Sequence, residues 1–218
     1  MKDREPLPEE EIEDYYDVIY RAQYGDEVRV RDPGRFLEWI SRKMETSQEE
    51  FGMSPATFFL LALKILKDVG VPIYYFFDRI KSKRMLMLGI MELVKQDPKM
   101  VDKLLKKDIN TLMVFKKLPK DLRKPFKETL SIIARTEIGE KQYLALEALS
   151  DFIEDDPELK EFFYSLLNDW DERVRYIVLK TLAKNPDEET KKHVRSIKYE
   201  ESNENNLKLI DYILSEDG

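Results

Sequence analysis

Five prolines in the chain each follow a residue whose side chain can accept hydrogen bonds from backbone amides. The pairs are Asp32-Pro33, Ser54-Pro55, Asp97-Pro98, Asp156-Pro157 and Asn185-Pro186. The first residue can cap the open amides at the start of a helix, and proline fits the first helical position because its missing N–H has no intrahelical partner there. Each pair therefore predicts a helix start, and together they divide the chain into a series of short helices.

Apolar residues recur between these starts with helical period, as in Ile12, Tyr15, Tyr16 and Ile19. The pattern predicts helices over 9–24, 33–50, 55–69, 72–81, 83–96, 98–107, 109–118, 122–135, 138–155, 157–168, 171–184, 186–198 and 203–215. The helix at 55–69 is apolar almost all round, so we expect it to be central. Residues 28–31 alternate like a strand but have no partner strand, which favours an extended connector. The predicted fold class is all-α.

The segment Leu166–Leu182 carries the most informative local motif, an Asp at a turn followed by a Val-Arg pair and then apolar residues at helical spacing. It resembles the second half of a HEAT repeat, with Asp169, Val174 and Arg175 at the positions of the family's turn Asp and Val-Arg pair. We expect Asp169 to cap the second helix and Arg175 to reach carboxylates or carbonyls of adjacent turns.

Two earlier segments share the pattern more weakly, Lys141–Leu149 at an offset of 33 from the first and Lys83–Met91 at a further offset of 59. The resemblance spans 138–200, is weaker over 72–136 and is not found over 1–70. It implies an irregular HEAT-like α-solenoid at 71–218 after an N-terminal helical region at 1–70, or one continuous domain. The alternative is a compact multi-helix bundle. HEAT-type proteins mostly bind other macromolecules, and a minority bind or modify nucleic acid.

Charge is unevenly distributed along the chain. The total net charge is −7, yet residues 79–136 contain 16 basic and 6 acidic residues, whereas residues 137–218 contain 11 basic and 21 acidic ones. A strongly basic segment inside an acidic protein is the clearest functional feature of the sequence. Several of its cations recur at helical spacing opposite apolar residues, so they are expected to lie on one side of consecutive helices.

The predicted basic face consists of Arg79, Lys83, Lys99, Lys103, Lys106, Lys116, Lys117, Lys120, Arg123, Lys127 and Arg135. Three interpretations are open. The cations pair with the chain's own acids, they bind another protein with an acidic surface (a second copy included), or they bind the phosphates of nucleic acid. The low isoelectric point and the lack of interleaved aromatics weigh against nucleic acid. The predicted function is a scaffold that binds an acidic protein partner, with nucleic-acid binding as the alternative.

No catalytic chemistry is indicated. The chain has no Cys and one His, and it contains neither a phosphate-binding glycine loop nor a nucleophile elbow, so we predict no enzyme activity, cofactor or metal site. His193 is expected to be exposed near a helix end. Trp170 is expected to pack between repeats, although helical-repeat DNA glycosylases place Trp and Asp on a basic face. Trp39 is expected in the core or at an interface.

Tyr16, Tyr20 and Tyr24 share one face of the first predicted helix, and we expect this face to pack in the core in preference to forming a binding surface. Abundant Lys and Glu with few Asn and Gln indicate a heat-adapted source. The charged segment from Met1 to Pro8 lacks the apolar stretch of a signal peptide, and the longest uncharged stretch is too short to cross a bilayer. We therefore expect a cytoplasmic location and no membrane contact.

Overall fold

The computed structural model describes residues 9–72 and 74–215, and the expectations for Met1 to Pro8 lie outside this part of the chain. The fold is all-α, as predicted, and no strand occurs within the described residues. None of the described helices combines the length and the apolar character needed to cross a membrane. Residues 28–31 belong to no helix or strand and connect the first helix to the second.

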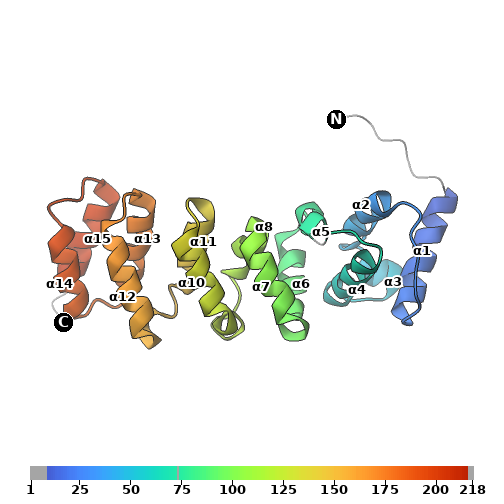
Figure 1. Cartoon of the computed structure of the whole chain (residues 1–218), viewed down its shortest axis with the longest axis horizontal. Coiled ribbons are helices and arrows are strands. Elements are labelled where there is room, and N and C mark those ends of the chain that lie inside the picture. The colour runs from blue at the N-terminus through green and yellow to red at the C-terminus, as the bar shows by residue number, and fades with distance from the viewer. Residues whose placement is uncertain (1–8, 73, 216–218) are drawn as a thin grey trace. The chain divides into compact units, whose positions relative to one another are not determined.

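The chain divides into two compact units, Met1–Val114 and Phe115–Gly218 (Figure 1). The helices of unit 1 are α1 (Glu9–Gln23), α2 (Pro33–Lys43), α3 (Ser47–Phe51), α4 (Pro55–Asp68), α5 (Tyr74–Arg79), α6 (Lys83–Gln96), α7 (Pro98–Lys107) and α8 (Ile109–Phe115), the last of which ends at the boundary. Those of unit 2 are α9 (Lys120–Arg123), α10 (Lys127–Thr136), α11 (Glu140–Leu149), α12 (Pro157–Ser165), α13 (Glu172–Leu182), α14 (Glu188–Ile197) and α15 (Glu204–Ser215). Three short 3-10 turns interrupt unit 2: η1 (Lys124–Phe126), η2 (Ile153–Asp155) and η3 (Leu166–Asn168).

Four of the five predicted helix starts are confirmed. Asp32, Ser54, Asp97 and Asp156 cap α2, α4, α7 and α12 by accepting hydrogen bonds from amides of the first turn, each with proline at the first helical position. The fifth start lies further on, because Asp187 caps α14 by accepting from the Thr190 amide at 2.8 Å. The Asn185-Pro186 pair therefore ends the preceding loop and does not begin the helix.

Helix α4 lies at the centre of unit 1, as its apolar circumference predicts. It contacts α1, α2, α3 and α6, and Phe58, Phe59 and Leu66 are fully buried. The ring of Phe59 lies against Gly89 of α6, where a Cβ atom would approach a ring carbon to 2.5 Å. This close contact joins α4 to α6 within unit 1, which extends to Val114.

Unit 2 is a series of helices in which sequence neighbours lie together. Helix α10 packs on α11, α11 on α13, α13 on α15, and α14 on α15, while η3 joins α12 to α13 (Figure 1). The predicted helix at 122–135 is broken into α9, η1 and α10 at Pro125, which cannot donate a backbone hydrogen bond. The predicted helix at 138–155 begins only at Glu140 because Gly139 has φ of +68°. The predicted helix at 33–50 is split at Met44–Thr46, where the Ser47 hydroxyl donates to the Met44 carbonyl.

Candidate interaction surfaces

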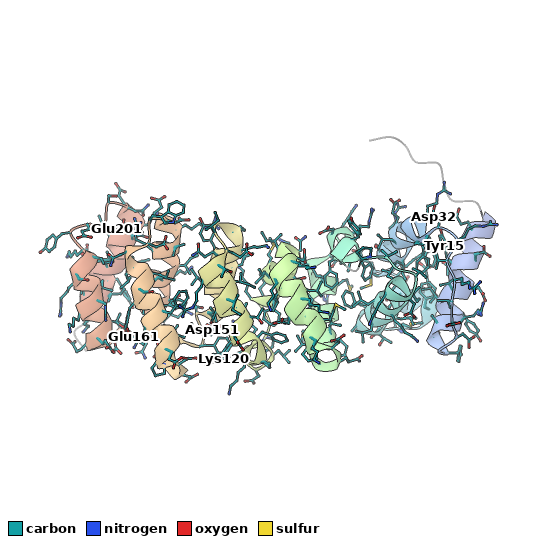
Figure 2. The ribbon with its side chains drawn as sticks, viewed as in Figure 1. Tyr15, Asp32, Lys120, Asp151, Glu161 and Glu201 are labelled. Carbon is teal, nitrogen blue, oxygen red and sulfur yellow. The ribbon has the colours of Figure 1, made fainter. Side chains whose placement is uncertain are left out.

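The basic residues of unit 2 face the unit's own acids. The acids lie at the end of α11 and in the loop that leads to α12, so the two charge blocks of the sequence meet in space. The pairs are Lys116–Glu147, Lys120–Asp155 at 2.7 Å, Arg123–Asp151 at 2.5 Å and Lys127–Asp156. Hydrogen bonds from Lys120 and Lys127 lower the pKa values of Asp155 and Asp156, which is the effect expected of such pairing. Figure 2 shows Lys120 and Asp151 at the same end of the unit 2 helices.

Arg123 is the centre of this region and is a buried cation. Its side chain is 4% exposed and donates to the carbonyl oxygens of Leu118 at 2.8 Å and Ala148 at 2.6 Å as well as to Asp151. Burial opposes ionisation of Asp151, but hydrogen bonds from Arg123 and Lys184 still lower the pKa of this carboxyl group. Each nitrogen of the Arg123 guanidinium donates to an acceptor inside unit 2, so this residue holds the loop after α11.

Phe152 supplies a common surface for three of these cations. The charged groups of Lys120, Arg123 and Lys127 lie 5.5–5.8 Å from the centre of its ring, within the range of cation–π attraction. The Arg135 guanidinium lies 3.8 Å from the ring centre of Phe162. These contacts, like the ion pairs, are made within the unit.

Within the predicted basic face, the cations that are both exposed and unpaired among the described residues lie mainly in unit 1. Lys83, Lys99 and Lys103 are exposed and make no ion pair with any residue that the structure describes, and the same holds for Lys117 at the start of unit 2. By contrast, Arg79 lies 3.4 Å from Glu38, and Lys106 lies 2.8 Å from Asp102 on its own helix. The predicted stripe on α7 therefore has two unpaired members and one that pairs along the helix.

The three residues of the HEAT-like motif all have structural roles. Val174 is fully buried. Arg175 donates to Glu201 at 2.8 and 2.9 Å and to the carbonyl oxygens of Asp169 and Trp170, which confirms its expected reach to adjacent turns. The expected cap is wrong by two residues, because Asp171 caps α13, whereas Asp169 accepts from the Asp171 amide at 2.8 Å and thereby shapes the turn.

Glu201 is the buried carboxylate that Arg175 reaches, and the sequence did not identify which carboxylate this is. Its side chain is 1% exposed and accepts from Arg175, from the Ser202 and Asn203 amides and from Asn206. The hydrogen bonds from Arg175 hold its pKa at about 2, although burial acts in the opposite direction. The same pairing raises the pKa of Arg175.

The prediction that Trp170 packs inside the fold is wrong. The residue is 82% exposed, because the turn that Asp169 shapes directs it to solvent. Ile138 and Tyr199, in the turns before α11 and α15, are 76% and 93% exposed. Trp39, by contrast, is buried between Tyr15 and Phe36, as predicted.

A pocket lies beside the Trp170 turn. Its lining includes Asp169, Arg175, Ile197, Glu200 and Glu201. Among them the Glu200 carboxylate is exposed and has no hydrogen bond or ion pair among the described residues. The charged side chains of the lining are three carboxylates and one cation, Arg175.

The tyrosines of α1 divide between core and surface. Tyr15 is buried and donates to Glu11 at 2.6 Å, and burial together with this bond raises its pKa. Tyr20 and Tyr24 are 61% and 69% exposed and contact each other at 5.0 Å between ring centres, so the core-packing prediction is wrong for them. A second pocket, lined by α1 and the connector at 28–31, opens beside Tyr15.

His193 is half-buried and is the most unexpected of the predicted positions. Its ring stacks on Tyr164 at 4.1 Å, and one potential ligand atom each from Glu161, Glu189 and His193 lie within 4.8 Å of one another. The spacing of Glu189 and His193 is four residues, which places them on one side of α14. The sequence predicts no metal site, and the four-residue spacing of Glu189 and His193 is the sequence feature that could have indicated this group. Both carboxylates are exposed, and exposed acids of this kind are common without a metal.

Comparison with protein-family models, curated proteins and solved structures finds no match to this chain.

Proposed function

We propose that the chain is a non-enzymatic, HEAT-like helical-repeat module that binds an acidic protein partner. The repeat character is supported by a contact that recurs at the same place in successive helix pairs of unit 2. The N-cap Asp156 of α12 accepts from the Leu159 amide through one oxygen and from Lys127 of α10 through the other. The N-cap Asp187 of α14 accepts from the Thr190 amide and, in the same way, from Lys160 of α12 at 2.6 Å.

The second helices of these pairs are also joined by ion pairs. Arg173 of α13 lies 3.3 Å from Glu140 of α11, and Arg175 of the same helix pairs with Glu201 ahead of α15. The two Lys–Asp contacts join equivalent positions at separations of 29 and 27 residues, as a stack of helix pairs requires. They favour the α-solenoid over the compact bundle for unit 2.

The observation that carries the proposed binding function is the contrast between paired and unpaired cations. In unit 2 the chain's own acids neutralise most of the predicted face. In unit 1, Lys99 and Lys103 lie one helical turn apart on α7, exposed and unpaired among the described residues, opposite the buried Val101 and Leu105. Charges without an intramolecular partner are those that a partner can pair without first breaking an existing bond.

The test compares two double substitutions in the full chain. Lys99→Glu with Lys103→Glu reverses the unpaired stripe, and Lys120→Glu with Lys127→Glu reverses the same charge at paired positions of unit 2. The probe is a fluorescein-labelled peptide of alternating Glu and Leu, followed by fluorescence anisotropy. We expect the first variant to weaken binding about tenfold, which corresponds to about 1.4 kcal/mol. The second variant should bind normally wherever circular dichroism shows that it remains folded.

Equal binding of the probe by the wild type and the α7 variant would contradict the proposal. A 20-base-pair DNA duplex serves as the comparison probe. If the duplex binds more tightly than the acidic peptide, and its affinity falls steeply between 50 and 200 mM salt, the nucleic-acid alternative replaces the acidic-protein proposal.

A further inference from the structure

Three turns of unit 2, at every second connection between its helices, each present a large apolar side chain to solvent. Ile138 lies between α10 and α11, Trp170 between η3 and α13, and Tyr199 between α14 and α15. We call these three residues the turn ridge. Figure 1 shows the three turns along the same edge of unit 2, and Figure 2 places Glu201, the neighbour of Tyr199, at that edge. Lys120 and Asp151 lie at the opposite edge (Figure 2).

The first two turns are fastened to each other by side chains. Arg173, just after Trp170, lies 3.3 Å from Glu140 and stacks over Tyr143 with its guanidinium carbon 4.3 Å from the ring centre. Tyr143 in turn donates to Asp171, and this bond raises the pKa of the phenol. The positions of Ile138 and Trp170 are therefore fixed relative to each other by contacts of Asp171 and Arg173, which follow Trp170 in the chain.

The second and third turns are fastened as firmly. Arg175 makes a bidentate pair with Glu201, and Asn203 donates to Glu172 at 3.0 Å. The Arg175 guanidinium also donates to the carbonyl oxygen of Trp170 at 3.3 Å. Because the backbone that carries the turn ridge is already ordered, a ligand that binds there meets little additional entropy cost.

Exposed Trp and Tyr side chains on a rigid edge are typical of binding hot spots. Trp170 contributes little to the core, since 82% of its surface is accessible. The chain's other tryptophan, Trp39, is 7% exposed, so the fold buries this residue type where packing requires it. The exposure of Trp170 therefore calls for an explanation outside the packing of unit 2.

The charged side chains around the turn ridge indicate what kind of partner can bind there. Residues 137–141, 169–175 and 198–204, which form and flank the three turns, contain eight acidic and four basic side chains. The pocket between the Trp170 and Tyr199 turns is lined by three carboxylates, of Asp169, Glu200 and Glu201, and one cation, Arg175. Arg175 neutralises Glu201, which leaves the carboxylates of Asp169 and Glu200 to attract a positive charge.

We propose that the turn ridge is a docking surface for a cationic segment of another protein. A Lys or Arg side chain of that segment enters the pocket beside Glu200 and Asp169, where the Trp170 ring offers a cation–π contact. Apolar side chains of the segment cover Ile138 and Tyr199. This surface differs from the basic stripe on α7 in its unit, its sign and its partner, so the two proposals stand or fall separately.

Trp170 itself provides the measurement. Acrylamide quenches exposed tryptophans, so in the full chain it acts on Trp170 far more than on buried Trp39. The probe is an unlabelled peptide of alternating Arg and Leu, and the control probe is the same peptide with Glu in place of Arg. We expect the Arg-Leu peptide to protect Trp170 from quenching and the Glu-Leu peptide to leave it accessible.

Three variants locate the site by isothermal titration calorimetry with the Arg-Leu peptide. Trp170→Ala and Glu200→Lys should each weaken binding at least tenfold while leaving the circular dichroism spectrum unchanged, because both side chains are exposed. Glu158→Lys makes the same charge change at the far end of α12 and should retain affinity within about twofold. Equal weakening in Glu158→Lys and Glu200→Lys would show attraction to any acidic surface and overturn the proposal.

Two further outcomes also overturn it. Absence of binding by the wild type at millimolar peptide would remove the cationic segment as the occupant. Self-association of the wild type in sedimentation equilibrium, abolished by Trp170→Ala, would assign the turn ridge to a second copy of the chain.

Discussion

The Arg175–Glu201 pair allows the most direct test of how unit 2 is held together. The Glu201 side chain is 1% exposed, and substitution of Arg175 with Ala leaves this buried carboxylate without its cation. A buried charge that has lost its partner typically costs about 3–5 kcal/mol. We expect Arg175→Ala to lower the free energy of unfolding at pH 7 by about that amount, measured by urea denaturation with far-UV circular dichroism.

The matched control is Arg173→Ala on the same helix. Arg173 pairs with Glu140, but the two side chains are 57% and 44% exposed, so solvent weakens their attraction. Exposed pairs contribute about 0–1 kcal/mol. A loss below 1 kcal/mol for Arg175→Ala, or one equal to that of Arg173→Ala, would refute the idea that burial sets the strength of this bond.

The same pair predicts a pH dependence with a definite sign. The Glu201 pKa is about 2 in the folded chain against an ordinary value of 4.5. A depressed folded pKa contributes stability above the ordinary value, and this contribution disappears as the pH falls through 4.5 to about 2. The difference corresponds to about 3 kcal/mol at 1.36 kcal/mol per pKa unit.

Arg175→Ala removes the main cause of the lowered pKa, so the pKa of Glu201 should rise. The wild type and the variant should then differ most at neutral pH and least near pH 2, where the carboxyl group is protonated in both. Parallel stability curves across this pH range would mean that Arg175 acts through packing and not through its charge.

Two other substitutions test single contacts. Arg123→Ala should lower the melting temperature of the chain and reduce the free energy of unfolding by about 2–4 kcal/mol, because two backbone carbonyls and Asp151 lose their buried donor. Arg123→Lys should not restore the stability, since an ammonium cannot span all three acceptors. Gly89→Ala should destabilise unit 1 by about 1–3 kcal/mol in urea denaturation because its Cβ would meet the Phe59 ring at 2.5 Å. Helix propensity alone predicts the opposite sign, a gain of about 1 kcal/mol, so a stabilised variant would disprove the close contact.

The positions of the helices could be predicted because they depend on neighbouring residues. Asp97 and Pro98 specify the start of α7 locally, and the bounds of α6 and α7 agree with the expected ranges. Where the predicted helix bounds differ from the observed ones, the cause is also local, but it lies in single residues that the hydrophobic periodicity does not reveal. Pro125 converts one turn to a 3-10 helix, and Gly139 adopts a positive φ that delays the next helix.

The candidate surfaces could not be predicted in the same way, because they depend on residues far apart in the sequence. Lys120 and Asp155 are 35 residues apart, and no local pattern shows that they meet. The exposure of Trp170 depends on the direction of a turn that Asp169 and Arg175 hold. The sequence showed where the charge lies along the chain, but only the packing of successive helices decides which charges are neutralised.

The recurring Lys–Asp contact allows this dependence on packing to be measured. In each case one carboxylate oxygen caps a helix and the other binds a lysine on the first helix of the preceding pair, with Lys127–Asp156 and Lys160–Asp187 as the two examples. The Asp therefore specifies both the start of its own helix and the register against its neighbour. Asn can cap as well as Asp, so Asp→Asn keeps the first role and removes the charge from the second.

A double-mutant cycle can separate the two roles at both positions. We expect Lys160→Met and Asp187→Asn to show a favourable coupling of about 0.5–1 kcal/mol in thermal or urea unfolding, because Asp187 is half exposed. Lys127→Met with Asp156→Asn should give a coupling of the same sign and similar size, since its geometry is equivalent. Couplings near zero in both cycles would mean that the lysines only solvate the surface. If only one pair is coupled, the equivalence of successive helix pairs fails, and with it the main support for a repeat architecture.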